Sequence, residues 1–380
     1  MTTQSIHRDD ILDVMRLVAC LFIMLFHFYS LHLDGPTAYP YGDSYDYFPY
    51  GYLGVQFFLI LSGFFLIPSL RRCDTFSQFV KKKIIRLWLP LLLCTIVTYV
   101  FVLIADTDVI YPEAHNISNF LFSLLCINPY WVNQFTPVHV GYINGAYWFM
   151  AIIVLFILGT ASVFFCDKKH GARNIVIMSI AFHVFHLLVF YYGNRIIVNY
   201  FCNNRLGIPF SENTMRQIQT FLGAWTYPTY SIFCTFGLVS YLILQRGMTK
   251  KNIMALVVIL VLFVTQFILI PANDMWELIM ICVILVLWSG YIYWRREHAT
   301  TQVMTNRFIC ALALLGCATY TAYLIHETIG VILIHKYAES FGSMDWILPI
   351  VLIACALLFG YASYKYIEQP IVRNLYKKYV

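Results

Sequence analysis

Charge is what this sequence has least of. Only 12% of its 380 residues are Asp, Glu, Lys or Arg, about half the share found in soluble globular proteins. By contrast, 60% are hydrophobic, and the mean hydropathy is +0.71. No polar stretch between the hydrophobic runs is long enough to form a soluble domain. These features exclude a water-soluble globular protein, and we expect residues 1–380 to form a single membrane domain.

The sequence also lacks the usual signals for metal, disulfide and nucleotide sites. Its eleven cysteines include no C-x-x-C pair, and most lie in apolar runs, where cysteine behaves as a small apolar residue. No G-x-S-x-G, P-loop or glycine-rich dinucleotide motif occurs. The net charge of +6 is explained below by membrane topology. We therefore expect no metal site, no disulfide framework and no nucleic-acid partner.

Long apolar runs recur along the whole chain. A helix needs about 20 mostly apolar residues to cross about 30 Å of hydrocarbon. The sequence predicts an all-α polytopic membrane bundle of about ten transmembrane helices. Their expected ranges are 11–31, 51–70, 86–105, 145–166, 174–192, 228–245, 252–271, 275–294, 308–335 and 346–366. A shorter apolar stretch, 118–127, is expected to be re-entrant or interfacial.

The basic residues alternate between the connections. Most Lys and Arg lie in a first set of connections, while the opposite set holds only Arg195, Arg205, Arg216 and Lys336. Because loops rich in Lys and Arg stay on the inner side of the membrane, this alternation predicts that both termini are cytoplasmic. The basic set comprises 71–85, 167–173, 246–251, 295–307 and the tail after Ile367.

The first apolar run carries an unusual pair of polar residues. In "RLVACLFIMLFH", Arg16 and His27 flank ten apolar residues. Eleven helical steps place them on nearly the same side, roughly 16 Å apart along the axis. Asp13 lies three residues before Arg16, which favours an ion pair between them. Polar groups inside a membrane helix are costly, so His27 is a candidate general base, a role that its ordinary pKa near 6.5 suits.

Other titratable residues fall inside or next to the apolar runs. His326, in "TYTAYLIHETIGVIL", lies at a depth similar to that of His27, so the two are expected to face one pocket. His183 and His186 are spaced i, i+3, and without a third ligand in sight we favour packing over a metal site. Glu368 precedes Pro370 in "IEQP"; a helix end with an ion pair and a catalytic role both stay open.

The connections on the expected outer side are rich in aromatic residues. Ranges 38–52 and 127–148 fit either an aromatic belt at the membrane surface or a platform on which sugar rings stack. Both interpretations can hold together. The carboxylates Asp34, Asp43 and Asp46 would then accept sugar hydroxyls.

Four stretches carry a resemblance to a known family. They are "ILDVMRLVACLFIMLFH", "GYLGVQFFLILSGFFL", "KKKIIRLWLP" and the terminal "YLIHETI" with "YKYIEQPIV". Together they resemble acyltransferase family 3, integral membrane proteins that decorate bacterial envelope polysaccharides. The resemblance implies a multi-pass protein of the bacterial inner membrane. It would transfer an acyl group, usually acetyl from acetyl-CoA, to a carbohydrate hydroxyl; whether the acceptor is lipid-linked, and the oligomeric state, stay open.

The resemblance also implies roles for particular residues. The family requires an Arg and a His in the first helix, here Arg16 and His27. Its basic stretch after the second span is associated with the phosphates of coenzyme A, which points to Lys83 and Arg86, with Arg16 as a further donor contact. We assign His27 as the base. His326 is the second choice for the base, or donates to the developing oxyanion.

The fourth span departs from the family pattern. Many members have a Trp followed shortly by a Glu, whereas this chain reads "AYWFMAIIVLFIL" without an acid. This departure suggests a divergent branch with another acceptor. Trp148, Tyr147 and Asn144, at the start of this span, are the residues expected to bind the sugar.

A non-enzymatic transporter is the alternative function. The same intramembrane polar groups would then line a path for a sugar-linked lipid or an ion. Such transporters tend to show inverted repeats with Gly or Pro breaks in matched positions, and no such pairing is detectable here.

Overall fold

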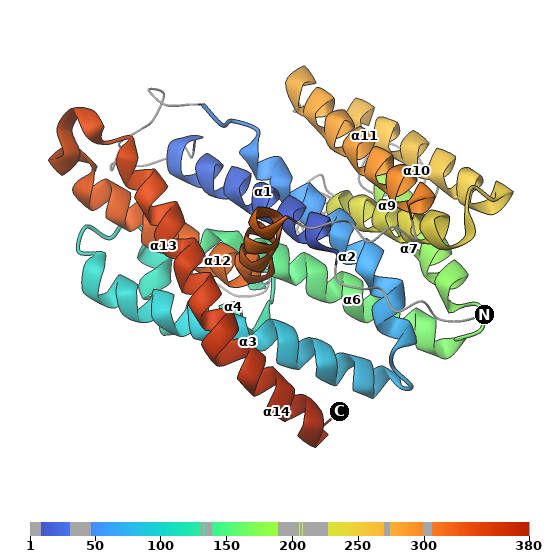
Figure 1. Cartoon of the computed structure of the whole chain (residues 1–380), viewed down its shortest axis with the longest axis horizontal. Helices are drawn as coiled ribbons and strands as arrows, with labels where there is room; N and C mark the ends of the chain where they lie inside the picture. The colour runs from blue at the N-terminus through green and yellow to red at the C-terminus, as the bar shows by residue number, and fades with distance from the viewer. Residues whose placement is uncertain are drawn as a thin grey trace.

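The computed structural model describes residues 9–30, 47–129, 132–133, 139–188, 205, 207, 227–269, 274–298 and 306–379. These residues form helices and turns, and no strand occurs among them. The predicted all-α class is therefore confirmed. Helix α12 lies near the centre of the bundle and packs against α1, α3 and α13 (Figure 1).

Each of the ten predicted runs contains a helix. Among the described residues, eight segments are long and apolar enough to cross a membrane, α7 is shorter, and α9 has 20 residues. The chain is a multi-pass membrane protein. The helices are α1 (Asp10–Leu25), α2 (Gly54–Arg71), α3 (Phe76–Ala105), α6 (Trp148–Cys166), α7 (Gly171–Leu187), α9 (Tyr227–Arg246), α10 (Lys250–Leu269), α11 (Met275–Glu297), α12 (Arg307–Tyr337) and α13 (Ile347–Ser363). The stretch predicted to be re-entrant or interfacial forms a short helix, α4 (Ile117–Leu125).

Helix α3 begins ten residues earlier than predicted. The Thr75 side chain accepts a hydrogen bond from the backbone N–H of Gln78 at 3.1 Å and so caps the helix. The basic residues 81–83 consequently lie on α3 and not in a loop. The charges of these lysines placed the predicted start of the apolar run too late, although lysine is a good helix former. Side chains also cap α1, α4, α11 and α12, at Asp9, Asn116, Asp274 and Asn306.

Pro370 does not end the last helix. A π-helical segment, Tyr364–Glu368, joins α13 to the C-terminal helix α14 (Gln369–Tyr379). Within it the backbone N–H of Gln369 bonds to the carbonyl of Tyr364. This wider turn reduces the clash that a proline ring makes in a regular α-helix, so the interpretation of "IEQP" as a helix end is wrong.

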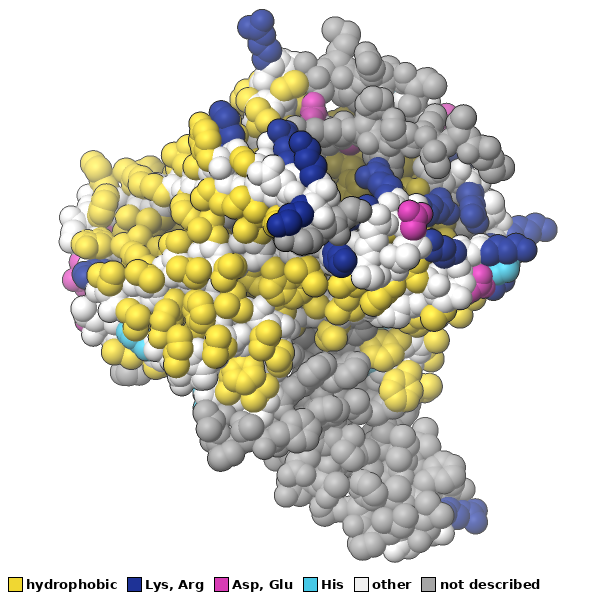
Figure 2. All heavy atoms as spheres, turned by 90° about the horizontal axis from the view of Figure 1, so that it is seen from below, with side chains coloured by type: hydrophobic (Ala, Val, Ile, Leu, Met, Phe, Trp, Pro, Cys, Tyr) yellow, Lys and Arg dark blue, Asp and Glu magenta, His cyan; other side chains and the backbone are white. Residues whose placement is uncertain are grey.

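The basic connections meet at one end of the bundle. Lys168 donates to the carbonyl of Asp74, joining two of them. The Tyr376 hydroxyl donates to the carbonyl of Lys82 at 3.1 Å. Figure 2 shows most of the visible Lys and Arg side chains gathered toward the upper right, beside a broad hydrophobic surface. The common location agrees with the alternation of charge, and the cytoplasmic placement of this end and of both termini stays a prediction.

Helices α2 and α9 cross at a pair of glycines. A Cβ at Gly63 would lie 1.9 Å from the carbonyl oxygen of Cys234, and one at Gly237 would lie 2.0 Å from that of Ile60. Membrane helices have no hydrophobic driving force for association, because lipid is as apolar as their side chains. Small residues let two helix backbones approach closely and so increase the van der Waals contact between them. This contact positions α2, which lines the site described below.

Replacing Gly63 with alanine is expected to destabilise the protein by at least about 1–3 kcal/mol, the usual cost of overpacking, because the methyl group meets backbone atoms. A thermal-shift assay on the detergent-purified protein should show a fall of several degrees. Gly159→Ala in α6 is the matched control, since no atom lies within 4 Å of its Cβ position. An equal response of the two variants would contradict the close crossing.

Candidate active site

His27 and His326 are in direct contact. The Nδ1 atom of His27 lies 2.7 Å from Nε2 of His326, although the residues are 299 positions apart. Phe28 packs where a side chain at Gly330 would lie, which fixes the register of the two helices at this level. The prediction that the two histidines share one layer is confirmed.

The local backbone at His27 differs from the prediction. Regular α-helix ends at Leu25, and Phe26–Ser30 form a π-helical segment. The rotation of 100° per residue, which the prediction assumed between Arg16 and His27, therefore applies only as far as Leu25. π-helical bulges inside α-helices are frequent at functional sites.

The hydrogen bonds define the tautomers of the two neutral rings. His326 Nδ1 lies 2.6 Å from the carbonyl oxygen of Tyr323, and a carbonyl only accepts, so this nitrogen carries the proton. His326 Nε2 is then an acceptor, and His27 Nδ1 must be the donor to it. Both Nε2 atoms are consequently unprotonated: that of His326 accepts from His27, and that of His27 is the candidate basic nitrogen. A second imidazole thus orients the His27 ring.

A cavity of about 770 Å³ opens at the end of the bundle that carries the basic connections. Along α2 its lining runs from Arg72 to Val55, a rise of roughly 25 Å. The other walls come from α1, α3, α6, α12 and the π segment with α14. Arg16, Lys83 and Arg86 all line it, so the structure brings the predicted donor-binding residues into one cavity.

The cavity is electropositive toward its mouth. The described lining residues include three carboxylates, of which two already pair with arginines: Asp13 with Arg16 at 2.6 Å, and Asp9 with Arg295 at 3.1 Å. The predicted Asp13–Arg16 ion pair is therefore confirmed, and the guanidinium also lies 4.9 Å from the centre of the Phe65 ring. Within the described ranges, four further lining cations form no ion pair. They are Arg72, Lys83, Arg86 and Arg373.

Glu368 is the third lining carboxylate. Its Oε1 atom accepts hydrogen bonds from the hydroxyls of Thr321 and Ser363, the latter at 2.9 Å. It therefore ties the π segment to α12 at the cavity wall. The sequence indicated Glu368 only through the family pattern. It gave no sign that Arg72 and Arg373 lie in the same cavity as Lys83, because these three cations come from three separate segments.

The cavity ends one helical turn short of the histidine pair. Tyr323 lines it, whereas neither histidine is among the described lining residues. The Tyr323 and His326 rings are 5.5 Å apart between centroids. Tyr323 thus lies between the cavity and the pair and bonds to His326 through its carbonyl.

The three residues predicted to bind a sugar differ in how exposed they are. Tyr147 and Asn144 are fully buried, whereas the sequence interpretation placed them on an outer surface. The Asn144 side chain caps the turn before α6 by accepting from the Ala146 N–H at 3.0 Å, and it donates to the Leu324 carbonyl at 3.2 Å. Trp148 is half-buried and packs against Tyr230, with ring centroids 5.0 Å apart. Only Trp148 of the three keeps part of its surface open.

A carboxylate lies against the start of α6 although that helix contains none. Glu327 of α12 is buried, and its Oε1 would be 2.3 Å from a Cβ at Gly145. The carboxylate therefore lies directly against the backbone at the start of α6. The sequence could not indicate this contact, because the two segments are far apart in the chain.

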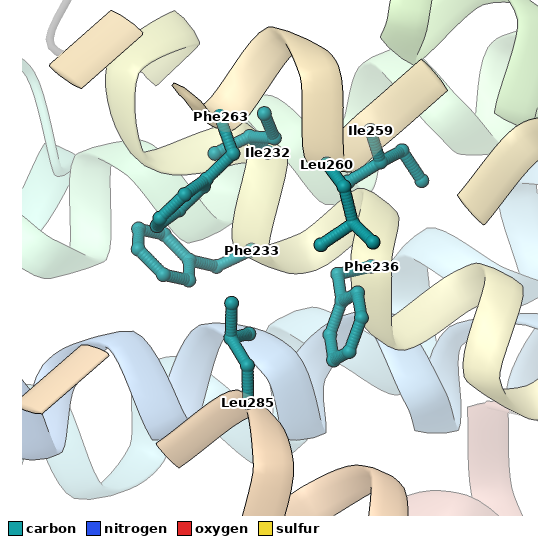
Figure 3. A pocket seen from close by; sticks show the side chains of 7 residues that line it. All are labelled: Ile232, Phe233, Phe236, Ile259, Leu260, Phe263 and Leu285. Atoms are coloured by element: carbon teal, nitrogen blue, oxygen red, sulfur yellow. The ribbon is translucent and has the colours of Figure 1, made fainter. Parts of the chain in front are cut away.

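Of the remaining candidates, the His183–His186 pair lies in the described part of the chain. The rings of His183 and His186 lie 6.5 Å apart, and no group of three or more metal-ligating side chains occurs in the described part of the chain. A hollow between α9, α10 and α11 has only apolar side chains among its described lining residues, such as Phe233, Phe263 and Leu285 (Figure 3). Asp34, Asp43 and Asp46 lie outside the described residues.

The fold and the site together define a class of protein. The chain is a multi-pass membrane bundle with a deep cationic cavity and an intramembrane histidine pair beyond the inner end of that cavity. The family profile described as "Acyltransferase domain", that of acyltransferase family 3, matches residues 9–365. The chain belongs to this family.

A curated relative points in the same direction. The chain is similar to a protein named O-acetyl transferase from Shigella phage Sf6, with 28% identity over 176 residues. The match covers 45% of this chain and 50% of the relative, so the chain spans about half the length of the curated relative it matches. No solved structure matches the chain.

Proposed function

We propose that this protein transfers an acyl group, most simply acetyl, from acyl-CoA to a hydroxyl of an envelope or secreted polysaccharide. The family and the name of the phage relative support O-acyl transfer. The observation that carries the proposal is the histidine pair, in which the bonding pattern makes Nε2 the unprotonated nitrogen of His27. We propose the bacterial inner membrane as its location, which the resemblance to the family implies.

In the proposed reaction, His27 acts as general base. Its Nε2 takes the proton of the acceptor hydroxyl as the oxygen attacks the thioester carbonyl. The carbon–sulfur bond then breaks, and the proton passes from His27 to the departing thiolate, giving the ester and free coenzyme A. His326 acts as a positioning residue, because it accepts from His27 Nδ1 and so supports the imidazolium form.

The cavity suits the proposed donor in charge and length. Lys83 and Arg86, with Arg72 and Arg373, would bind its phosphates through charge-assisted hydrogen bonds. An extended pantetheine arm measures on the order of 15 to 20 Å, the rise of roughly 10 to 13 helical residues. Such an arm fits along the α2 wall and carries the thioester from the mouth to the level of Tyr323. No metal enters this scheme.

The acceptor is proposed to approach from the opposite side. Aromatic faces with partly exposed surface stack on sugar rings, and Trp148 beside Tyr230 offers such a face. A lipid-linked carbohydrate in the outer leaflet would reach His27 without crossing the cationic cavity.

Membrane vesicles supplied with radiolabelled acetyl-CoA test the proposal. Vesicles from expressing cells should transfer label to glycan, whereas vesicles with His27→Ala should not. Mass spectrometry of envelope glycans from cells with and without the gene identifies the acceptor. If purified protein neither consumes the acetyl thioester nor transfers it, with glycan present or absent, the transporter alternative is favoured instead.

A further inference from the structure

Three aromatic rings lie together near the inner end of the cavity. Phe58 of α2, Phe149 of α6 and Tyr323 of α12 all line it. The Phe149 and Tyr323 centroids are 5.7 Å apart, and the Phe58 ring lies 6.4 Å from each of the other two. We call these three residues the aromatic cap. Each ring touches the other two, so the cap is one packed unit built from three helices.

The cap lies between the cavity and the histidine pair. Its Tyr323 ring is 5.5 Å from the His326 ring, and His326 contacts His27. The Tyr323 hydroxyl donates to the Ala146 carbonyl at 2.9 Å, which holds this ring in place. Phe58 and Phe149 carry no polar group and are held by packing alone. Phe58 is half-buried, so it has the most room to move.

We propose that the aromatic cap limits the length of the acyl group that the enzyme accepts. This inference rests on the proposed function and extends it to the donor's acyl class, namely two-carbon groups in preference to longer ones. A thioester at the inner end of the cavity places its acyl carbons against the cap. An acetyl methyl group needs only a small displacement of Phe58, whereas each further methylene must enter a space already filled by rings.

The arrangement also explains how selection is coupled to reaction. The same residue, Tyr323, contributes its ring to the cap and its carbonyl to the orientation of His326. A chain long enough to displace that ring would disturb the histidine pair. Long acyl groups are therefore penalised in binding at the cap and again in the chemical step.

Competition binding measures the effect without knowledge of the acceptor. Purified full-length protein in nanodiscs is loaded with radiolabelled acetyl-CoA, which is then displaced by unlabelled acetyl-, butyryl- or hexanoyl-CoA. The wild type should bind hexanoyl-CoA at least tenfold more weakly than acetyl-CoA. Phe58→Ala should reduce that ratio at least tenfold, and Phe149→Ala should reduce it in the same direction.

Phe57→Ala is the matched control. It removes the same ring from the adjacent position of α2, where Phe57 contacts Trp288, 5.8 Å away between centroids, and does not line the cavity. The ratio of the hexanoyl-CoA to the acetyl-CoA dissociation constant in this variant should stay within twofold of the wild-type ratio. Should Phe58→Ala fail to fold, Phe58→Leu removes less volume and should shift the ratio in the same direction.

The outcomes separate the two proposals. If the wild type binds acetyl-CoA and the cap variants show the same ratio of hexanoyl-CoA to acetyl-CoA dissociation constants as the wild type, the proposed role of the aromatic cap is wrong. The proposed function is unaffected by that result. A wild type that binds hexanoyl-CoA as tightly as acetyl-CoA would lead to the same conclusions. Failure of the wild type to bind acetyl-CoA at all would overturn the proposed function, and the cap with it.

Discussion

Replacing His27 with alanine is expected to lower kcat for acyl transfer by about 10²- to 10⁴-fold, the range typical of a lost general base. The dissociation constant for acetyl-CoA should change less than twofold, because His27 does not line the donor cavity. Single-turnover transfer of labelled acetyl groups, with donor binding measured separately, gives both values.

The control for this experiment is another histidine. His298 is exposed and stacks on Trp294, with ring centroids 5.3 Å apart. His298→Ala should retain wild-type transfer. His326→Gln provides a second comparison, because an amide can restore only part of the hydrogen bonding that orients His27, and it should lower kcat with little effect on donor binding. Normal transfer by His27→Ala would show that the base lies elsewhere.

Neutralising the cations at the cavity wall should act on donor binding instead. Lys83→Gln or Arg86→Gln is expected to raise the dissociation constant for coenzyme A by about 10- to 100-fold, since a hydrogen bond to a charged group contributes about 1.5–3 kcal/mol. The effect should weaken at high salt, as for other charge pairs near water. Isothermal titration calorimetry on the nanodisc-embedded protein measures it directly.

Lys81 supplies the matched control for this prediction. It is exposed on the same helix and is not among the described residues that line the cavity. Lys81→Gln should leave the dissociation constant within twofold of the wild type. A uniform loss for all three substitutions would indicate a general effect of surface charge and contradict a phosphate site at Lys83 and Arg86.

The general fold could be predicted from hydropathy alone, because apolar runs of membrane length have few alternatives to helix. Counting residues from the helix ends also placed His27 and His326 at one level. The boundaries were less accurate where polar residues continue a helix. Thr75 caps α3 far ahead of its apolar part, and the π segment after Leu25 has no periodicity that sequence inspection detects.

The set of residues that lines the cavity could be predicted only in part. Arg16 was noticeable in the first apolar run, and the family pattern added Lys83 and Arg86. Arg72 and Arg373 resembled ordinary topological charges, and only the fold brings them into the cavity. The aromatic cap comes from three helices whose contacts no local pattern reveals. The role of the aromatic residues in the connections was ambiguous for a related reason. A membrane-surface belt, a protein core and a sugar-binding platform are all rich in the same aromatic residues. Asn144 and Tyr147 belong to the core in this structure.

A cryo-electron microscopy structure of the protein with coenzyme A bound tests the central claim most directly. The account predicts phosphate density against Lys83 and Arg86, the pantetheine arm along α2, and the sulfur beside Tyr323, facing the histidine pair. Coenzyme A bound outside this cavity, or with its sulfur directed away from Tyr323, would contradict the account.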